Sequence, residues 1–162
     1  RTKKSEYAMQ LTEKQKVKFV YGILEKQFHM LYEKAERMNG NTGELLLSLV
    51  ERRLDNVVYR LGFAKTRREA RQLVNHGHFT VNGKRVNIPS YQTGLGDVIA
   101  VSEKSCAATR FKTMKEDNTF VAAPKWLERD KNTLSGKVIA LPARDDIDFE
   151  IAENLIVELY SK

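Results

Sequence analysis

Cysteine is almost absent from this chain of 162 residues, which contains one, Cys106. A single thiol excludes a disulfide within the chain, so we expect a protein of a reducing, cytoplasmic compartment. Long apolar runs are missing as well. Residues 45–47 and 98–101 fall far short of the ~20 apolar residues of a membrane-spanning helix. We therefore expect no membrane partner.

Motifs for nucleotide or metal chemistry are also missing. The sequence has no glycine-rich phosphate loop of the Walker or dinucleotide type. His76 and His78 flank Gly77, but no cysteine or carboxylate at ligand spacing completes a metal site. Cys106 has no histidine near it in the sequence, and we expect an inert thiol. We predict no enzyme, no metal and no cofactor.

Positive charge, by contrast, is concentrated in one segment. The chain holds 28 Lys and Arg against 21 Asp and Glu, a net charge of +7. Residues 52–91 hold nine bases and two acids, which leaves 19 of each in the rest of the chain. Seven of the nine bases are arginine, whose guanidinium group binds phosphate bidentately. This pattern favours a nucleic-acid partner over a solvated charged surface, and RNA weakly over DNA because no DNA-reading motif is evident.

The order of the secondary structure follows from hydrophobic spacing. Apolar residues at steps of three and four predict helices over residues 12–21, 28–35, 44–61, 67–76, 104–116 and 150–160. Short apolar runs predict strands over residues 78–81, 84–88, 98–101, 126–129 and 137–141. Thr12 with Gln15, and Thr66 with Glu69, have the spacing of capping boxes that begin helices. Gly22 and Gly77 are expected to end the first and the fourth helix, and Asn82-Gly83 predicts a hairpin turn between two strands. We expect the first two helices to form a hairpin. Arg52, Arg53 and Arg60 are expected on the more solvent-exposed faces of the third helix.

The helix over residues 67–76 has two different faces. At 100° per residue, Ala70, Leu73 and Val74 form an apolar side. The other side carries Arg67, Arg68, Arg71, Gln72 and Asn75. A rigid element of this kind presents several phosphate-binding groups together.

Several segments resemble the ribosomal protein S-four family of the small subunit, in its bacterial form. They are RLDNVVYRLG at residues 53–62, TRREARQLV at 66–74, HGH at 76–78, VNG at 81–83 and VNIPS at 86–90. The flanking residues 5–7, 13–16 and 156–162 agree, whereas the similarity is weakest over 106–144. The family normally carries a further segment ahead of Arg1, and we expect this chain to lack it.

The resemblance implies an α+β fold with two domains. It implies a discontinuous helical domain, residues 1–49 with 145–162, and an inserted RNA-binding domain, residues 50–144, that contains a small antiparallel sheet and an Arg-rich helix. It also implies a structural constituent of the small ribosomal subunit that binds the 5′ domain of 16S ribosomal RNA, nucleates assembly and affects translational accuracy. The implied partners are this RNA, ribosomal protein S-five and, in some members, the protein's own messenger RNA. We expect a monomer when the protein is free.

The residues expected to contact RNA come from the basic segment and from the family motif. In the inserted domain they are Arg52, Arg53, Arg60, Lys65, Thr66, Arg67, Arg68, Arg71, Gln72, Asn75, His76, His78, Asn82, Lys84, Arg85, Asn87 and Tyr91. In the helical domain they are Lys3, Lys4, Lys14, Lys16 and Lys18.

Two alternatives use the same RNA-binding module. An accessory RNA-binding factor or RNA chaperone would bind free subunits. A pseudouridine synthase is suggested by the Arg-Leu-Asp run at residues 53–55. However, Leu54 is expected in a hydrophobic core and the chain is too short for a synthase domain. We therefore predict that Asp55 forms a salt bridge or lies on a helix surface.

Overall fold

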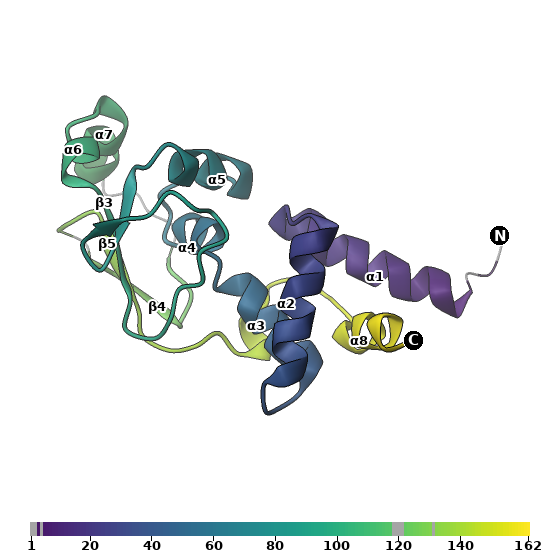
Figure 1. Ribbon diagram of the computed structural model, residues 1–162. Coiled ribbons are helices and arrows are strands. Elements are labelled where there is room, and N and C mark those ends of the chain that lie inside the picture. Colours follow the sequence, from purple (N-terminus) through teal and green to yellow (C-terminus); the bar gives the residue numbers. More distant parts are fainter. Residues whose placement is uncertain (1–2, 4, 118–121, 131) are drawn as a thin grey trace. The chain divides into compact units, whose positions relative to one another are not determined.

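The computed structural model describes residues 3, 5–117, 122–130 and 132–162, and it divides into two compact units (Figure 1). The terminal unit comprises Arg1–Glu51 with Ala143–Lys162, and the central unit comprises Arg52–Pro142. Each unit contains a hydrophobic cluster of its own. The mixture of helices with a small antiparallel sheet confirms the predicted α+β class.

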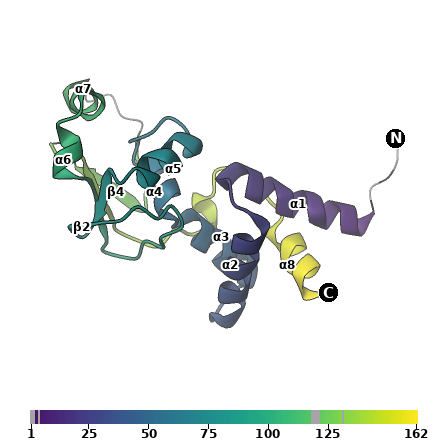
Figure 2. The same ribbon diagram turned by 45° about the horizontal axis from the view of Figure 1, so that its top comes forward.

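The terminal unit is helical. Its elements are α1 (Glu6–Tyr21), α2 (Glu25–Arg37), α3 (Thr42–Glu51), the 3-10 turn η1 (Arg144–Asp146) and α8 (Glu153–Ser161). Helix α1 packs along α8, and α2 packs along α3 (Figure 2). The predicted hairpin of the first two helices is therefore wrong, because the apolar face of α1 meets a helix from the other end of the chain. Val17, Phe28 and Ile156 are fully buried in this core.

Helix α1 begins earlier than the sequence predicts. The Ser5 side chain accepts a hydrogen bond from the backbone N–H of Ala8 at 3.2 Å and caps the helix. Thr12 lies inside α1, where its hydroxyl donates to the Ala8 carbonyl at 2.7 Å, so the predicted capping box at Thr12 is wrong. The helix ends at Gly22 as predicted, because glycine adopts the left-handed conformation there (φ +67°) at little cost.

The prediction of a single helix over residues 44–61 is wrong, because the helical conformation is interrupted between α3 and α4 (Leu54–Arg60). Arg53 is extended (φ −61°, ψ 141°), which ends the helical path. The Arg52 carbonyl accepts from the backbone N–H and the hydroxyl of Thr93, at 3.0 and 2.8 Å. Bonds to a distant segment thus replace bonds that a continuous helix would make.

The central unit combines helices with an antiparallel sheet. Its helices are α4, α5 (Arg67–Asn75), α6 (Glu103–Cys106) and α7 (Thr109–Asp117). Its strands are β1 (Phe79–Val81), β2 (Lys84–Arg85), β3 (Val98–Val101), β4 (Leu127–Asp130) and β5 (Ser135–Val138). Among the described residues the strand order is β2-β1-β3-β5-β4. All five predicted strands exist, β3 with the predicted bounds and the other four with shifted ends, whereas the helix predicted over 104–116 is two helices.

Alternation along the strands directs one face of the sheet to the core. Phe79 and Val81 on β1, with Ile99 and Val101 on β3, are buried. They belong to the same cluster as the apolar residues of α4 and α5. Helix α5 packs beside α4 (Figure 1), so the polar side of α5 is held at the surface.

Candidate nucleic-acid interface

Residues of the local sequence define where α5 begins and where it ends. The Thr66 hydroxyl accepts from the backbone N–H of Glu69 at 3.1 Å, and the Glu69 carboxylate accepts from the N–H of Lys65 at 3.3 Å. The first of these bonds satisfies a backbone donor that a helix start leaves without a partner, and the second fastens the residue before the cap to the first turn. Gly77, with φ +77°, follows the helix end as predicted.

The two faces of α5 match the prediction with one exception. Ala70, Leu73 and Val74 are buried. On the opposite side Arg68, Gln72, Asn75 and His76 are exposed, and Arg71 is partly exposed. The exception is Arg67, which is partly exposed like Arg71 but whose guanidinium group is held against α4. The exposed residues form a rigid polar surface suited to phosphate and sugar groups.

Arg67 is held by α4. Its Nε donates to the side-chain oxygen of Asn56 at 2.9 Å, and its guanidinium carbon lies 4.6 Å from the centre of the Tyr59 ring. Asn56 is 1% exposed, so this bond is made inside the unit. Arg60 lies on the same ring, with its guanidinium carbon 5.9 Å from the ring centre, and is partly exposed.

The hairpin β1–β2 brings a second group of predicted residues to the surface. Asn82 (φ +53°) and Gly83 (φ +83°) form the predicted turn. The Asn82 amide donates to the Asp97 carboxylate at 3.0 Å and accepts from the N–H of Val98 at 2.9 Å. Because both polar atoms of the amide bind residues at the start of β3 or directly before it, the expected RNA contact of Asn82 is not supported. The remaining predicted residues of this segment, Lys84, Arg85, Asn87 and Tyr91, are exposed or partly exposed.

Arg85 joins the hairpin to the end of α5. Its Nε donates to the carbonyl of Gly77 at 3.1 Å. Positive charge converges here: the pKa of His78 is lowered, first by burial and then by the charges of His76, Arg110 and Arg85. The lowered pKa favours the neutral imidazole of His78, whose Nδ1 lies 2.8 Å from the Ser105 hydroxyl.

Arg110 on α7 is a basic residue of this surface that sequence reasoning missed. It forms an ion pair with Glu69 of α5, 41 residues away. No local spacing signals this contact, because it depends on how α7 docks. The pair places a further guanidinium beside the exposed face of α5.

Two predicted RNA contacts are used inside the protein. Arg53 is 1% exposed and donates to both carboxylate oxygens of Asp55, at 3.2 and 3.1 Å. The prediction that Arg53 lies on a more solvent-exposed helix face is therefore wrong. Asp55 forms the expected salt bridge, and this salt bridge is buried. The Nε of Arg52 donates to the Thr93 carbonyl at 2.9 Å, and burial lowers the pKa of Arg52.

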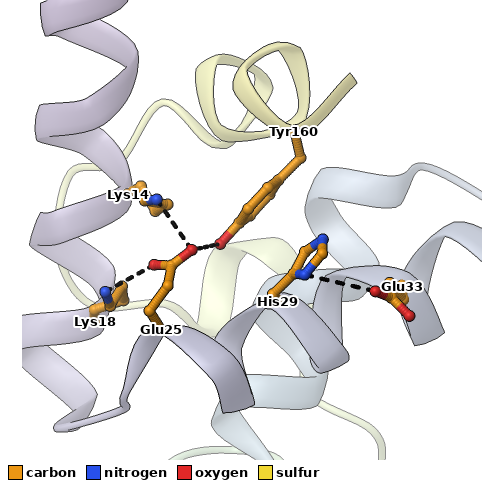
Figure 3. A network of polar contacts seen from close by, with 6 residues as sticks. All are labelled: Lys14, Lys18, Glu25, His29, Glu33 and Tyr160. Atoms are coloured by element: carbon orange, nitrogen blue, oxygen red, sulfur yellow. Dashed lines mark hydrogen bonds and ion pairs between the residues drawn. The ribbon is translucent and has the colours of Figure 1, made fainter. Parts of the chain in front are cut away.

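Two lysines predicted to contact RNA belong to a network around Glu25 (Figure 3). Lys14 and Lys18 of α1 lie 3.1 and 2.8 Å from the Glu25 carboxylate. Tyr160 of α8 donates to the same group at 2.8 Å, and the Lys14 ammonium lies 5.2 Å from the centre of the Tyr160 ring. The lysine side chains are only 12% and 16% exposed, so they join α1, α2 and α8 rather than extending a basic surface.

The other basic residues predicted near the N-terminus differ in their surroundings. Lys16 lies 3.1 Å from Glu13 and donates to the Glu150 carbonyl at 3.4 Å, which directs it toward its own unit. Lys3 is exposed. Lys4 lies outside the described residues.

Two other kinds of site are absent from the part of the chain that the structure describes. None of its helices is both long and apolar enough to span a bilayer. Among the same residues, no three His, Cys, Asp or Glu side chains are grouped so that they could hold a metal ion.

Comparison with known proteins gives matches along the whole chain. Residues 1–51 match the model of the ribosomal protein S4/S9 N-terminal domain, and residues 52–99 match the model of the S4 domain. Small ribosomal subunit protein uS4 of Caldicellulosiruptor bescii is 64% identical over 162 residues, which are 100% of this chain and 78% of that protein. The uS4 protein of Clostridioides difficile is 60% identical with the same coverage. That of Acetivibrio thermocellus is 62% identical over 160 residues, 99% of this chain and 77% of its own.

Proposed function

Because this chain belongs to the uS4 family of small ribosomal subunit proteins, we propose that its central unit binds the 5′ domain of 16S ribosomal RNA through α5 and the β1–β2 hairpin. The protein is a ribosomal structural protein that binds ribosomal RNA, and it is not an enzyme. The observation that carries the proposed interface is the convergence of the exposed side of α5, Arg85 and Arg110 around His76 and His78.

The contact set is narrower than the sequence alone predicts. We assign RNA contacts to Lys3, Arg60, Lys65, Arg68, Arg71, Gln72, Asn75, His76, His78, Lys84, Arg85, Asn87, Tyr91 and Arg110. The predicted residues with structural roles in the protein are Arg52, Arg53, Thr66, Asn82, Lys14, Lys16 and Lys18. Most contacts should go to phosphate and sugar, so that selectivity depends on the shape of the folded RNA.

The finer roles implied by the family resemblance belong to the same proposal. We propose that residues 50–144 act as the RNA-binding domain, inserted into a helical domain formed by residues 1–49 and 145–162. Bound to RNA, the protein helps nucleate the subunit, contacts ribosomal protein S-five and influences translational accuracy, and, as in some members of the family, it binds its own messenger RNA. We further propose that the protein is cytoplasmic and that it is monomeric before it binds RNA.

Binding of this chain to the 5′ domain RNA across a salt series tests the proposal. Duplex RNA and duplex DNA of equal mass serve as competitors. We expect binding that survives competition, with a slope of log affinity against log salt of roughly −4 to −5 if about six phosphates are neutralised. Equal affinity for all three nucleic acids would overturn the proposal.

An accessory factor or RNA chaperone with the same module would behave differently on intact particles. A structural constituent should remain with mature small subunits during sedimentation in high salt. An accessory factor should dissociate, because its contacts are mainly electrostatic. Loss of the protein from the particles would therefore favour the alternative.

A further inference from the structure

Arg67 differs from the other arginines of α5 in where its guanidinium group lies. Its Nε is bonded to the buried Asn56, its guanidinium carbon lies 4.6 Å from the centre of the Tyr59 ring, and its Nη2 atom is buried. Arg68, the next residue, is exposed. A guanidinium enclosed in this way presents less of its planar edge to a phosphate than an exposed one does.

Asn56, which binds Arg67, is itself held in place by a series of buried polar contacts. The backbone N–H of Asn56 donates to Asp55 at 2.7 Å, and Asp55 accepts two hydrogen bonds from Arg53. Arg53, Asp55 and Asn56 are 1%, 3% and 1% exposed. Polar groups buried this deeply hold their partners in one geometry, because losing a bond leaves a costly unsatisfied group.

The chain of contacts ends at the first turn of α5. Arg67 is the first residue of that helix, directly after the Thr66 cap. A side chain anchored at this position fixes both the distance of α5 from α4 and its rotation about its own axis. That rotation decides which way Arg68 and Arg71 point.

We propose that Arg67 is a positioning residue: with Asn56 and Tyr59 it docks α5 on α4, so that Arg68 and Arg71 face the RNA. Arg67 therefore acts in RNA binding through other residues. This inference rests on the proposed function for its RNA readout, and it has a second readout that needs no RNA.

The test compares Arg67→Lys and Arg67→Ala with the matched control Arg68→Ala. A positioning role needs the planar group, so both Arg67 variants should bind the 5′ domain RNA at least about fivefold more weakly with an unchanged slope of log affinity against log salt. Arg68→Ala should reduce the magnitude of that slope by about one. If lysine restores affinity, or if Arg67→Ala also reduces the slope by about one, Arg67 is a direct phosphate contact and the proposal is wrong.

Hydrogen exchange supplies the readout without RNA. Amides of α5 should exchange at least about fivefold faster in both Arg67 variants than in the wild type, and at an unchanged rate in Arg68→Ala. Tyr59→Leu, which removes the ring but keeps an apolar side chain, should reproduce the effect and provides a test if the Arg67 variants fold poorly. Unchanged exchange in these variants would overturn the inference. If the wild type binds no RNA selectively, the proposed function fails while the exchange experiment still decides the role of Arg67.

Discussion

At the scale of single residues, Gly77 illustrates a glycine whose replacement would alter the proposed RNA-binding face. Its φ of +77° is unfavourable for other residues, and a Cβ there would collide with the Arg85 guanidinium. Arg85 is the residue that links the hairpin to the end of α5. Gly83 has a similar φ of +83°, but a Cβ at that position would meet nothing within 4 Å. Comparing substitutions at the two glycines therefore distinguishes the effect of backbone strain from the effect of displacing the Arg85 side chain.

Gly77→Ala should lower both stability and RNA affinity. We expect Gly83→Ala to cost about 1–2 kcal/mol of unfolding free energy from backbone strain alone, and Gly77→Ala to cost more because Arg85 must also move. Urea unfolding measures the first quantity, and titration with the 5′ domain RNA measures the second. Equal RNA affinity of the two variants would show that the placement of Arg85 is unimportant for binding.

At the scale of elements, ionic contacts join helices that are distant in the sequence. The Glu25 carboxylate accepts from groups on α1 and α8 (Figure 3). Burial alone would raise its pKa, but the bonds from Lys18, Tyr160 and Lys14 outweigh that effect and lower the pKa to about 2. The pKa of Tyr160 is raised, first by burial and then by its bond to Glu25. The network therefore stabilises the terminal unit only while Glu25 is ionised.

Glu25→Gln should remove an acid-sensitive part of the stability. Because the folded pKa lies below the ordinary value of 4.5, the contribution is complete above about pH 4.5 and is lost as the pH falls toward 2. The Glu25 side chain is 47% exposed, so we expect a difference from wild type of only about 0.5–1 kcal/mol at pH 7, shrinking at pH 3. Urea unfolding at both pH values measures it. Glu33→Gln is the control, since Glu33 contacts only His29 and Arg37 among the described ion pairs, at 3.5 and 3.7 Å; an equal loss in both variants would contradict the prediction.

The ion pair between α5 and α7 restrains a base of the proposed interface. Glu69→Gln keeps an acceptor for the N–H of Lys65 but releases the charge of Arg110. We expect RNA affinity to rise about twofold to fivefold, with a steeper dependence on salt, because the Glu69 carboxylate no longer competes with phosphate for the charge of Arg110. Filter binding at several salt concentrations measures both. Weaker binding would mean that the ion pair is needed to dock α7.

At the scale of the whole molecule, the net charge of +7 resides in the basic segment, residues 52–91. In the structure some of these basic residues are buried in ion pairs and others are exposed to solvent. Arg53 is buried with a carboxylate, whereas Arg68, Lys84 and Arg85 are exposed. Only the exposed charges contribute to long-range attraction of RNA, because a buried ion pair is neutral at a distance.

Charge reversal of Arg68 and Arg71 together should abolish selective RNA binding. These side chains lie on the polar side of α5, away from the buried Leu73. We therefore expect the unfolding free energy to change by less than about 0.5 kcal/mol per substitution, as is usual for surface positions. RNA titration and urea unfolding of Arg68→Glu with Arg71→Glu measure both effects. Retained selective binding would exclude this face as the main RNA contact.

Features that depend on residues close together in the chain follow from the sequence alone. The cap at Thr66, the apolar side of α5, the Asn82-Gly83 turn and the stop at Gly22 are all predicted from sequence and confirmed. Each depends on local hydrogen bonds or on backbone conformations available to one residue type. The concentration of positive charge predicts a nucleic-acid partner, and the resemblance of the motif residues to the ribosomal protein S-four family implies an RNA-binding ribosomal protein, which family membership confirms.

Tertiary packing, by contrast, sets which of the predicted bases reach the surface. Arg53, Lys14 and Lys18 are held by carboxylates, and the break before α4 depends on bonds to Thr93. Arg110 reaches α5 only through the docking of α7. Most of these contacts join residues that lie far apart in the sequence. Arg53 and Asp55 are close in the sequence, but their ion pair is buried by residues of other elements. Helical periodicity reports the direction of a side chain relative to its own helix, and it contains no information on the partner that meets it there.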